Sequence, residues 1–595
     1  MSIPVNSLLK LLIITLSLSL TACGGGGGTG PNQAQADLSE LVVSNSSPIQ
    51  IREGVFDYTV VTNHQNGTVR ITPTATAAST GANITVNGVV VPSGMTGEQI
   101  PIPDTGSKTI TIVINHPNTA TKTYTVNVSR LTTSIFQPDQ TRLLADTSVN
   151  NDKFATQVAL SGNTLAIGVP HTTPTDQQPG SVYIFVRDPA NNSWIKQARI
   201  FASNAENGDR FGTSVSLAGN TLVVGAPLED SKANFGEGFG EDDIFDIFDT
   251  DGITVIGTGS GNIGAAYVFT RDTATSTWTE RAYLKPSIDI KNYNRNILFG
   301  SQVAISGNTI AVASVFEKSS LRGVHQFPLI VDPLEPRVIK SGAVYVFTGN
   351  GANWTQQAYI KASNPGADDR FSSSLALQGD TLVIGAPRED SNATGINSDE
   401  LNNSAIDAGA VYVYKRNGAT WTQNAYLKAS NTQADARFGN SVTIDGNTLI
   451  AGAFRESSNA VSVNGDQNNE YAPRSGAAYV FTQPGNSWQQ QAYLKSANTQ
   501  SGGSFGASVS LAANRLAVGA SGEDFGKGAV NIFTRTGASS PWILHDTILM
   551  DNPRARYLFG NSVALSDDGK LLAMGALEDS SGGQSKAGAA YIIRQ

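Results

Sequence analysis

The residues best suited to chemistry in this sequence are carboxylates, and the densest group of them could hold a calcium ion. Asp246, Asp249 and Asp251 fall within six residues in the segment DDIFDIFDTDG. Carboxylate oxygens are donors that Ca²⁺ prefers, but these aspartates lack the alternate spacing and the closing Glu of an EF-hand loop. Because Ile and Phe residues lie between them, we expect a solvated acidic loop beside a packed or partner-binding strip. Calcium binding is the alternative, and we assign no metal ligand.

A second set of carboxylates recurs along the chain, after segments that begin Gly-Ala. Because they recur, we expect these groups to serve the fold, by capping loop amides and pairing with neighbouring Arg residues. The members are Glu229-Asp230-Ser231, Glu389-Asp390-Ser391, Glu456, Glu523-Asp524 and Glu578-Asp579-Ser580, joined by Asp209-Arg210 and Asp369-Arg370.

Sequence motifs of enzymes are missing. No H-E-x-x-H, G-x-S-x-G, Gly-Lys-Ser/Thr phosphate loop or Cys-x-x-Cys occurs, and no two of the five histidines lie within seven residues of each other. The net charge of −9 argues against nucleic acid as a partner. We therefore expect a non-enzymatic protein with no catalytic residues and no cofactor. A polysaccharide-active enzyme is the alternative from another class.

The only cysteine, Cys23, cannot form an internal disulfide, and its setting predicts lipidation. It follows an apolar run, Leu11 to Leu20, that is typical of a secretory signal and too short for a bilayer core of ~30 Å. The tetrapeptide Leu20-Thr21-Ala22-Cys23 resembles the bacterial lipobox, in which the thiol receives diacylglycerol and the chain is cut before the cysteine. The resemblance implies a lipoprotein signal peptide at residues 1–22 and a membrane anchor of several acyl chains. Gly24 is not the Asp that retains such proteins in the inner membrane, which favours outer-membrane delivery in a Gram-negative cell.

The elements that position these groups are expected to be β-strands. Charged residues make up only 15% of the 595, and 60 are Gly and 24 are Pro, which is typical of β-structure rather than helical bundles. Residues 23–36 are Gly-rich, have no apolar side chain larger than Ala beyond the cysteine, and predict a flexible tether.

Residues 37–131 predict an immunoglobulin-like β-sandwich of roughly seven strands. Short alternating runs separated by turn residues begin at Leu38, Phe56, Val69, Asn83, Lys108 and Lys122. The opening Leu38, Leu41 and Val43, the Tyr58 of the second run and the closing Tyr124 to Val128 resemble the cadherin-like β-sandwich domain of bacterial surface proteins. The resemblance implies a spacer or docking module without catalytic residues.

Residues 139–595 are filled by an internal repeat of about 65 residues. Each unit opens on a Phe and later has a Gly that begins a strand, and all six tryptophans occupy one place before the last strand, which indicates packing. The opening residues are Phe154, Phe211, Phe299, Phe371, Phe438, Phe505 and Phe559, the glycines are Gly180, Gly264, Gly342, Gly409, Gly476, Gly528 and Gly588, and the tryptophans are Trp194, Trp278, Trp354, Trp421, Trp488 and Trp542.

Each unit reads as four antiparallel strands, A to D, with a two-residue Gly-Asn or Gly-Asp turn between A and B. Seven such units predict a seven-bladed β-propeller. The last unit stops at strand C, whereas Thr141 to Asp146 precedes the first Phe at the spacing of a D strand. We therefore expect the N-terminal strand to complete the last blade.

The repeated FG-x-S-V followed by GAP resembles the FG-GAP repeat of the integrin α-chain propeller and its bacterial relatives. In integrins, calcium lies in A to B loops of the D-x-D-x-D-G type. Here those loops are two-residue turns, and only Asp567-Asp568-Gly569 is faintly acidic. The resemblance therefore does not transfer calcium to this chain.

Strand alternation places the long B to C and D to A connections on one face. The sequence thus favours a lipid-anchored protein of the bacterial cell envelope, attached to the outer membrane and facing either the periplasm or the medium. Its long-loop face would bind a protein or glycan, in adhesion or as an envelope scaffold, and a purely structural component is a further alternative. Specificity is expected in the unrepeated parts, the insertion between Pro227 and Gly264 and the stretch from Phe316 to Lys340.

Overall fold

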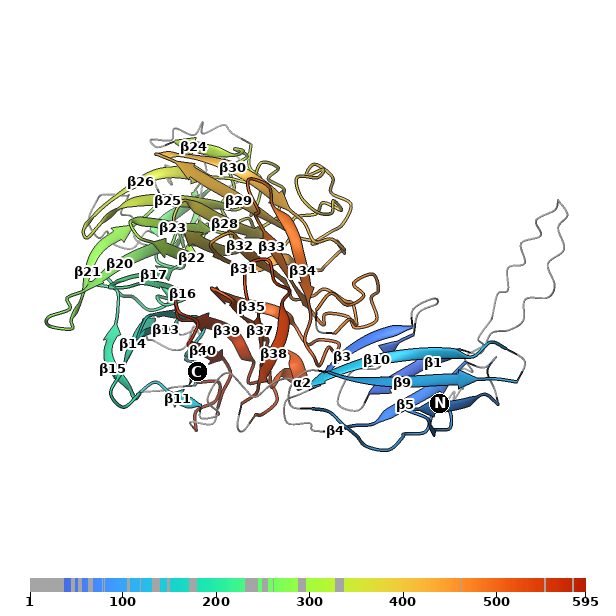
Figure 1. Ribbon diagram of the computed structural model, residues 1–595. Coiled ribbons are helices and arrows are strands. Elements are labelled where there is room, and N and C mark those ends of the chain that lie inside the picture. The colour runs from blue at the N-terminus through green and yellow to red at the C-terminus, as the bar shows by residue number, and fades with distance from the viewer. Residues whose placement is uncertain are drawn as a thin grey trace, which may run out of the picture.

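The computed structural model is built almost entirely of β-strands, and in the part of the chain it describes the one short helix is α2 (Glu523–Gly526) (Figure 1). It describes residues 37–595 except 44–48, 52–55, 63–67, 77–78, 80, 104–106, 118, 131–139, 147–149, 171–178, 231–243, 249–254, 261, 287–295, 327–335, 462, 551–552 and 581–582. Cys23 and the segments predicted to be a signal peptide and a tether lie outside these residues.

The N-terminal module has sheets of three, five and two strands, ordered β2-β1-β5, β3-β10-β9-β6-β7 and β4-β8. All six runs expected from the sequence form strands. Alternate residues of the long strand β9 are buried, and Ile110, Ile112 and Ile114 face a core that also holds Tyr124. The strands are β1 (Leu38–Val43), β2 (Ile49–Gln50), β3 (Asp57–Thr62), β4 (Thr68–Val69), β5 (Ile71–Ala75), β6 (Asn83–Val86), β7 (Val89–Val90), β8 (Ile100–Pro101), β9 (Ser107–Asn115) and β10 (Lys122–Arg130).

The repeat units form seven sheets in the described residues, numbered here 1 to 7 along the chain, each with antiparallel strands in the order A-B-C-D. The A strands are β12 (Val158–Ser161), β16 (Ser214–Ala218), β22 (Phe299–Ser306), β27 (Ser374–Gln378), β31 (Phe438–Asp445), β35 (Phe505–Ala512) and β39 (Phe559–Leu565). The B strands are β13 (Thr164–Val169), β17 (Thr221–Ala226), β23 (Thr309–Ser314), β28 (Thr381–Ala386), β32 (Thr448–Ala453), β36 (Arg515–Ala520) and β40 (Leu571–Ala576). The C strands are β14 (Ser181–Arg187), β20 (Ala265–Arg271), β25 (Ala343–Asn350), β29 (Ala410–Asn417), β33 (Ala477–Thr482), β37 (Ala529–Thr534) and β41 (Ala589–Arg594). The D strands are β15 (Trp194–Ile200), β21 (Trp278–Leu284), β26 (Asn353–Ile360), β30 (Thr420–Leu427), β34 (Gln489–Leu494), β38 (Ile543–Ile548) and, for sheet 7, β11 (Thr141–Leu143).

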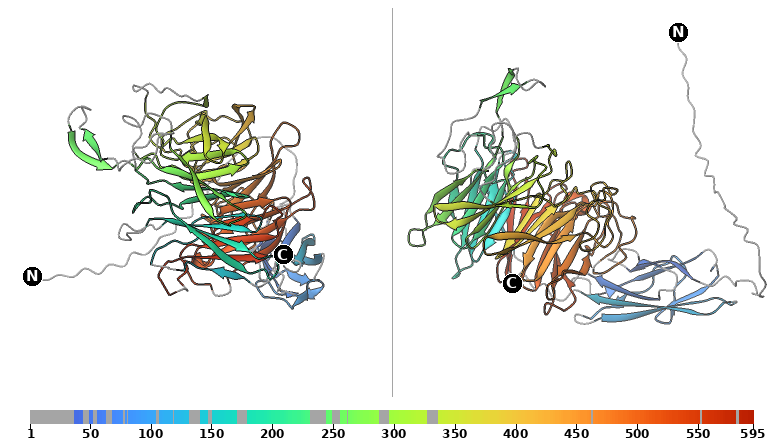
Figure 2. Two further views of the ribbon diagram at one scale, coloured as in Figure 1. Left: turned by 90° about the vertical axis from the view of Figure 1, so that its left-hand side faces the viewer. Right: turned by 90° about the horizontal axis from the view of Figure 1, so that it is seen from above.

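The strand from the start of the repeat region completes the last sheet, as the complementary ends predicted. β11 pairs antiparallel with β41, with Leu143 opposite Ala590. Each A strand also contacts the next A strand, and the series returns from β39 to β12. The sheets follow one another in a propeller-like arrangement (Figures 1 and 2).

The repeated Phe and Gly meet at the boundary between successive sheets. A Cβ placed on Gly476 would lie 2.0 Å from the carbonyl oxygen of Phe505 in the next sheet, and Gly476 also has a φ of +83°. The same contact joins Gly588 of sheet 7 to Phe154 of sheet 1, at 2.2 Å. A side chain at these positions would push neighbouring sheets apart, so the glycine is required by close backbone approach and by its positive φ.

Four of the six tryptophans, Trp278, Trp421, Trp488 and Trp542, also join neighbouring sheets, in agreement with their expected packing role. The indole N–H of Trp421 donates to Gln357 and that of Trp488 donates to Asn424, each on the D strand of the preceding sheet, at 2.9 and 3.0 Å. Trp421 is almost fully buried.

Three described strands of the repeat region lie outside the four-strand pattern. β24 (Val324–Gln326) adds a fifth strand beside β26 in sheet 3, where it covers the outer edge. β18 (Ile244–Phe248) and β19 (Val255–Ser260) form a separate hairpin in the long insertion of sheet 2. Asp246 lies in β18, opposite Thr258, whereas Asp249 and Asp251 lie outside the described residues.

Candidate functional site

The loops that join strands B and C, and strand D to the next A strand, form what we call the loop face. In sheets 2 to 7 the recurrent acidic residue of the B to C loop comes three residues after strand B ends. In sheets 2 to 5 this residue is Glu229, Glu317, Glu389 and Glu456, and all four side chains are buried. Glu317 lies in a stretch that sequence reasoning had set aside as unrepeated.

Each of these four glutamates forms an ion pair with a buried lysine at the end of its own D strand. The Nζ atoms lie 2.7 to 2.9 Å from the carboxylates in three of the pairs, and burial lowers the lysine pKa while the nearby carboxylate opposes that shift. The pairs are Lys285–Glu229, Lys361–Glu317, Lys428–Glu389 and Lys495–Glu456.

Sheet 5 shows how completely such a carboxylate is engaged. Glu456 accepts hydrogen bonds from Tyr493 at 3.0 Å, from Asn431 of the preceding loop at 3.1 Å and from the backbone N–H of Ser458 at 3.1 Å. Lys495 donates in addition to Ser475 and to the carbonyl of Ser458. The expectation that these groups serve the fold is therefore confirmed, although the partner is a lysine of strand D rather than a neighbouring arginine.

Sheet 7 replaces the lysine with another cation. By position after strand B, Asp579 rather than Glu578 corresponds to Glu456, and Arg142 of β11 lies 3.3 Å from its buried carboxylate. Glu578 instead pairs with Lys153 of sheet 1 at 2.8 Å. Both contacts join the beginning of the repeat region to its end.

Sheet 6 retains the acid and lacks the lysine. Leu549 follows β38 at the position of Lys495, and its side chain is half exposed. Glu523 is 4% exposed and accepts a hydrogen bond from Ser496 at 2.9 Å. Burial raises the pKa of Glu523 to about 7, against hydrogen bonds from Asn498 and Ser496 that lower it.

The aspartates before the repeated Phe cap loop amides, as expected. Asp209 accepts the backbone N–H of Glu206 at 3.0 Å, and Asp369 accepts that of Gly366 at 2.6 Å. Burial raises the pKa of each carboxyl to about 7, because the backbone hydrogen bond offsets only part of the desolvation.

A chain of aspartate–arginine pairs crosses the loop face from sheet 4 to sheet 5. Arg437 contacts Asp407 at 2.8 Å and Asp435 at 3.3 Å, and Asp435 is also 2.7 Å from Arg455. Burial raises the pKa of Asp435, but hydrogen bonds from Arg455 and Arg437 outweigh burial, so the pKa lies below its usual value.

Large apolar side chains are exposed at the tips of several B to C loops. Ile339, Ile406 and Phe525 each stand three residues before the glycine that begins strand C, and Phe525 is 85% exposed. Leu401 and Tyr471 are exposed on the same set of loops. The loop face thus presents apolar groups above a layer whose buried carboxylates are already engaged.

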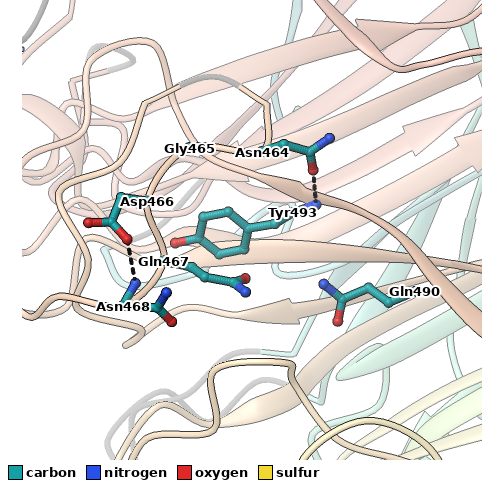
Figure 3. A pocket seen from close by; sticks show the side chains of 7 residues that line it. All are labelled: Asn464, Gly465, Asp466, Gln467, Asn468, Gln490 and Tyr493. Carbon is teal, nitrogen blue, oxygen red and sulfur yellow. Dashed lines mark hydrogen bonds between the residues drawn. The ribbon is translucent and has the colours of Figure 1, made fainter. Parts of the chain in front are cut away.

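A pocket of about 280 Å³ lies in the B to C loop of sheet 5 (Figure 3). Its polar side chains come from that loop and from β34. They are Asn464, Asp466, Gln467, Asn468, Gln490 and Tyr493. Sequence reasoning missed this pocket and the D-strand lysines, although the recurrent AYLK segment could have indicated the lysines.

The described residues hold no cluster of three or more His, Cys, Asp or Glu side chains placed to bind a metal ion. Among the helices that are described, none has the length and apolar character needed to cross a bilayer.

Comparison with known families identifies both parts of the chain. The FG-GAP repeat model matches residues 138–185, 194–238, 354–414, 421–481 and 488–533. The cadherin-like β-sandwich domain model matches residues 38–131. The chain thus contains five matched FG-GAP repeats and an N-terminal cadherin-like β-sandwich domain.

Two similar solved structures are a putative 6-phosphogluconolactonase from Bacteroides uniformis and the periplasmic gluconolactonase of Pseudomonas aeruginosa. The first is 9% identical with a TM-score of 0.38 and covers 69% of this chain and 89% of its own. The second is 13% identical with a TM-score of 0.38 and covers 75% and 94%. This level of similarity carries no argument about activity. No curated protein matches the chain by sequence.

Proposed function

We propose that this chain is a lipid-anchored protein of the bacterial outer membrane. In this proposal a cadherin-like module of immunoglobulin-like topology acts as a spacer, and a seven-bladed FG-GAP propeller binds a protein or glycan partner through its loop face. Contact between the first and last sheets and the pairing of β11 with β41 support the seven-bladed ring. The resemblance of residues 20–23 to the lipobox supports the anchor.

The observation that carries the binding role is the composition of the loop face. Its recurrent carboxylates are held by buried lysines in sheets 2 to 5, by Arg142 in sheet 7 and by a hydrogen bond from Ser496 in sheet 6, so they serve the scaffold. The tips of the same loops instead expose large apolar groups such as Ile406 and Phe525. Exposed apolar groups gathered on one face are typical of interaction surfaces. The same engagement of the carboxylates supports a non-enzymatic role.

Binding of the purified protein to isolated bacterial cell envelopes tests the proposal. We expect saturable binding that falls at least tenfold in an Ile406→Ser/Phe525→Ser variant. Val90→Ser in the sandwich removes another exposed apolar group, away from the loop face, and serves as the control. Equal loss in both variants, or no saturable binding, would contradict a binding role for the loop face. Added protease on intact cells then separates a surface position, where the propeller is cut, from a periplasmic one.

A further inference from the structure

We propose that the pocket in the B to C loop of sheet 5 binds an uncharged saccharide. This inference rests on the proposed function, because it names the class of glycan that the loop face would recognise and the place where it would bind.

The side chains around the pocket suit hydroxyl groups. Four of the six polar ones are amides, each with a donor and an acceptor, and a sugar hydroxyl also donates and accepts. Asp466 adds carboxylate acceptors, and no Lys, Arg or His lines the pocket, so it lacks the cations that would attract a phosphate or uronate. The volume of about 280 Å³ lies just below the usual range of ~300–1,000 Å³ for ligand sites and suits a small ligand of one or two sugar rings.

One acceptor in the pocket has no partner. The amide nitrogen of Gln490 donates to Ser430 at 2.9 Å. Its Oε1 atom is buried and makes no hydrogen bond within the described structure. A buried acceptor without a partner is costly, and a ligand hydroxyl would satisfy it once the Gln490 side chain turns this atom toward the pocket.

The walls of the pocket are held in place by the scaffold. Tyr493 donates through its hydroxyl to Glu456, and its backbone N–H donates to Asn464 at 2.9 Å (Figure 3). The carbonyl of Gln467 accepts a hydrogen bond from Asn431 at 2.8 Å. The buried pair of sheet 5 therefore fixes the aromatic wall before any ligand arrives, which reduces the entropy lost on binding.

The corresponding loop of sheet 4 shows which features are not needed for folding. There Asn397 accepts the backbone N–H of Tyr426 at 2.9 Å, as Asn464 does for Tyr493. Glu400 stands in the place of Gln467 and accepts from Ser363 at 2.8 Å, whereas Gln467 accepts from Ser430 at 2.9 Å. Leu401 stands in the place of Asn468.

The two loops thus share their internal hydrogen bonds and differ in the side chains offered to a ligand. Sheet 4 offers a charged and an apolar group, and sheet 5 offers two neutral amides. Because the fold accepts either pair, the amides of sheet 5 are available for recognition.

The test uses the natural difference between the two loops. Malto-, cello- and manno-oligosaccharides are titrated by calorimetry into the full protein, with oligogalacturonate as the anionic comparison. We expect at least one neutral series to bind and oligogalacturonate not to bind. The variant Gln467→Glu/Asn468→Leu gives sheet 5 the residues of sheet 4, so it should keep the melting temperature and lose at least tenfold in affinity. The reciprocal Glu400→Gln/Leu401→Asn should leave affinity unchanged.

Three results overturn the inference: no neutral series binds, oligogalacturonate binds in preference, or the double variant of sheet 5 binds as tightly as the parent. If the envelope-binding assay still gives saturable binding that depends on Ile406 and Phe525, the proposed function survives and only the saccharide assignment is lost. If saccharides bind at the pocket but the protein does not bind envelopes, the saccharide assignment survives and the proposed envelope-binding function is lost.

Discussion

The raised pKa of Glu523 predicts that the stability of the protein depends on pH, and one substitution should remove the contribution of this residue. Burial raises the pKa of this carboxyl from 4.5 to about 7, so the folded chain keeps the proton at pH 5 to 6 whereas the unfolded chain releases it. The native state then binds more protons than the unfolded state, and stability falls as pH rises from about 4.5 to 7. At ~1.36 kcal/mol per pKa unit, the loss approaches ~3 kcal/mol above pH 7.

Glu523→Gln should remove this loss, since the neutral amide can still accept the hydrogen bond from Ser496. We expect the variant to be more stable than the parent by up to ~3 kcal/mol at pH 8 and nearly equal to it at pH 4.5. Asp209 and Asp369 have pKa values raised in the same way, so part of the pH dependence remains. Urea unfolding followed by tryptophan fluorescence measures the difference, because Trp542 is buried in the same sheet.

Glu456→Gln is the matched control in sheet 5. It leaves the fully buried Lys495 without its anion, so it should destabilise by ~3–5 kcal/mol at both pH values. If Glu523→Gln were as destabilising at pH 8 as Glu456→Gln, the reasoning would be refuted, because Glu523 would then be ionised with a favourable partner. An unchanged pH profile would refute it equally.

Four further predictions concern the anchor, the ring, its glycines and calcium. Cys23→Ala should release the protein from the membrane fraction, and undiminished association would show the lipobox interpretation to be wrong. Deleting 141–146 removes β11 and leaves β41 with an unpaired edge, so we expect aggregation or a less cooperative melt, against which an unchanged single transition would count. Gly476→Ala should destabilise by more than ~1 kcal/mol in urea unfolding, because the new Cβ meets Phe505 at 2.0 Å, whereas the same change at Gly485 meets nothing within 4 Å and should cost less. Adding or chelating Ca²⁺ should leave the melting temperature unchanged, and a chelator-sensitive melt abolished by Asp249→Asn would instead assign calcium to that loop.

The strands were predictable because their signals are local and repeated. The Gly-Asn turns, the apolar B and C segments and the spacing of Thr141 to Asp146 each set one feature of the sheets, and the structure has those features. Register within a sheet follows from short turns that leave little freedom.

The side-chain partners were harder to predict because they are set by three-dimensional neighbours. Glu389 and Lys428 are 39 residues apart and meet only when strands B, C and D are paired. The pocket of sheet 5 depends on a loop folding against β34, and nothing local distinguishes its amides from those of a solvated loop. The absence of a lysine beside Glu523 becomes informative only once the equivalent positions of the repeats are superposed.

The pairing of β11 with β41 also places the attachment point of the N-terminal module on the last sheet. A load applied through that module would reach the repeat region first at β11. This strand lies at the edge of its sheet and is paired with one strand, β41. Arg142 on that strand is also the cation opposite Asp579, and Asn150 farther along accepts the backbone N–H of Ser585, 435 residues away. Tension would therefore act on the contacts that join the two ends of the repeat region. The three-residue strand β11 would bear this load before the longer strands of the seven sheets do.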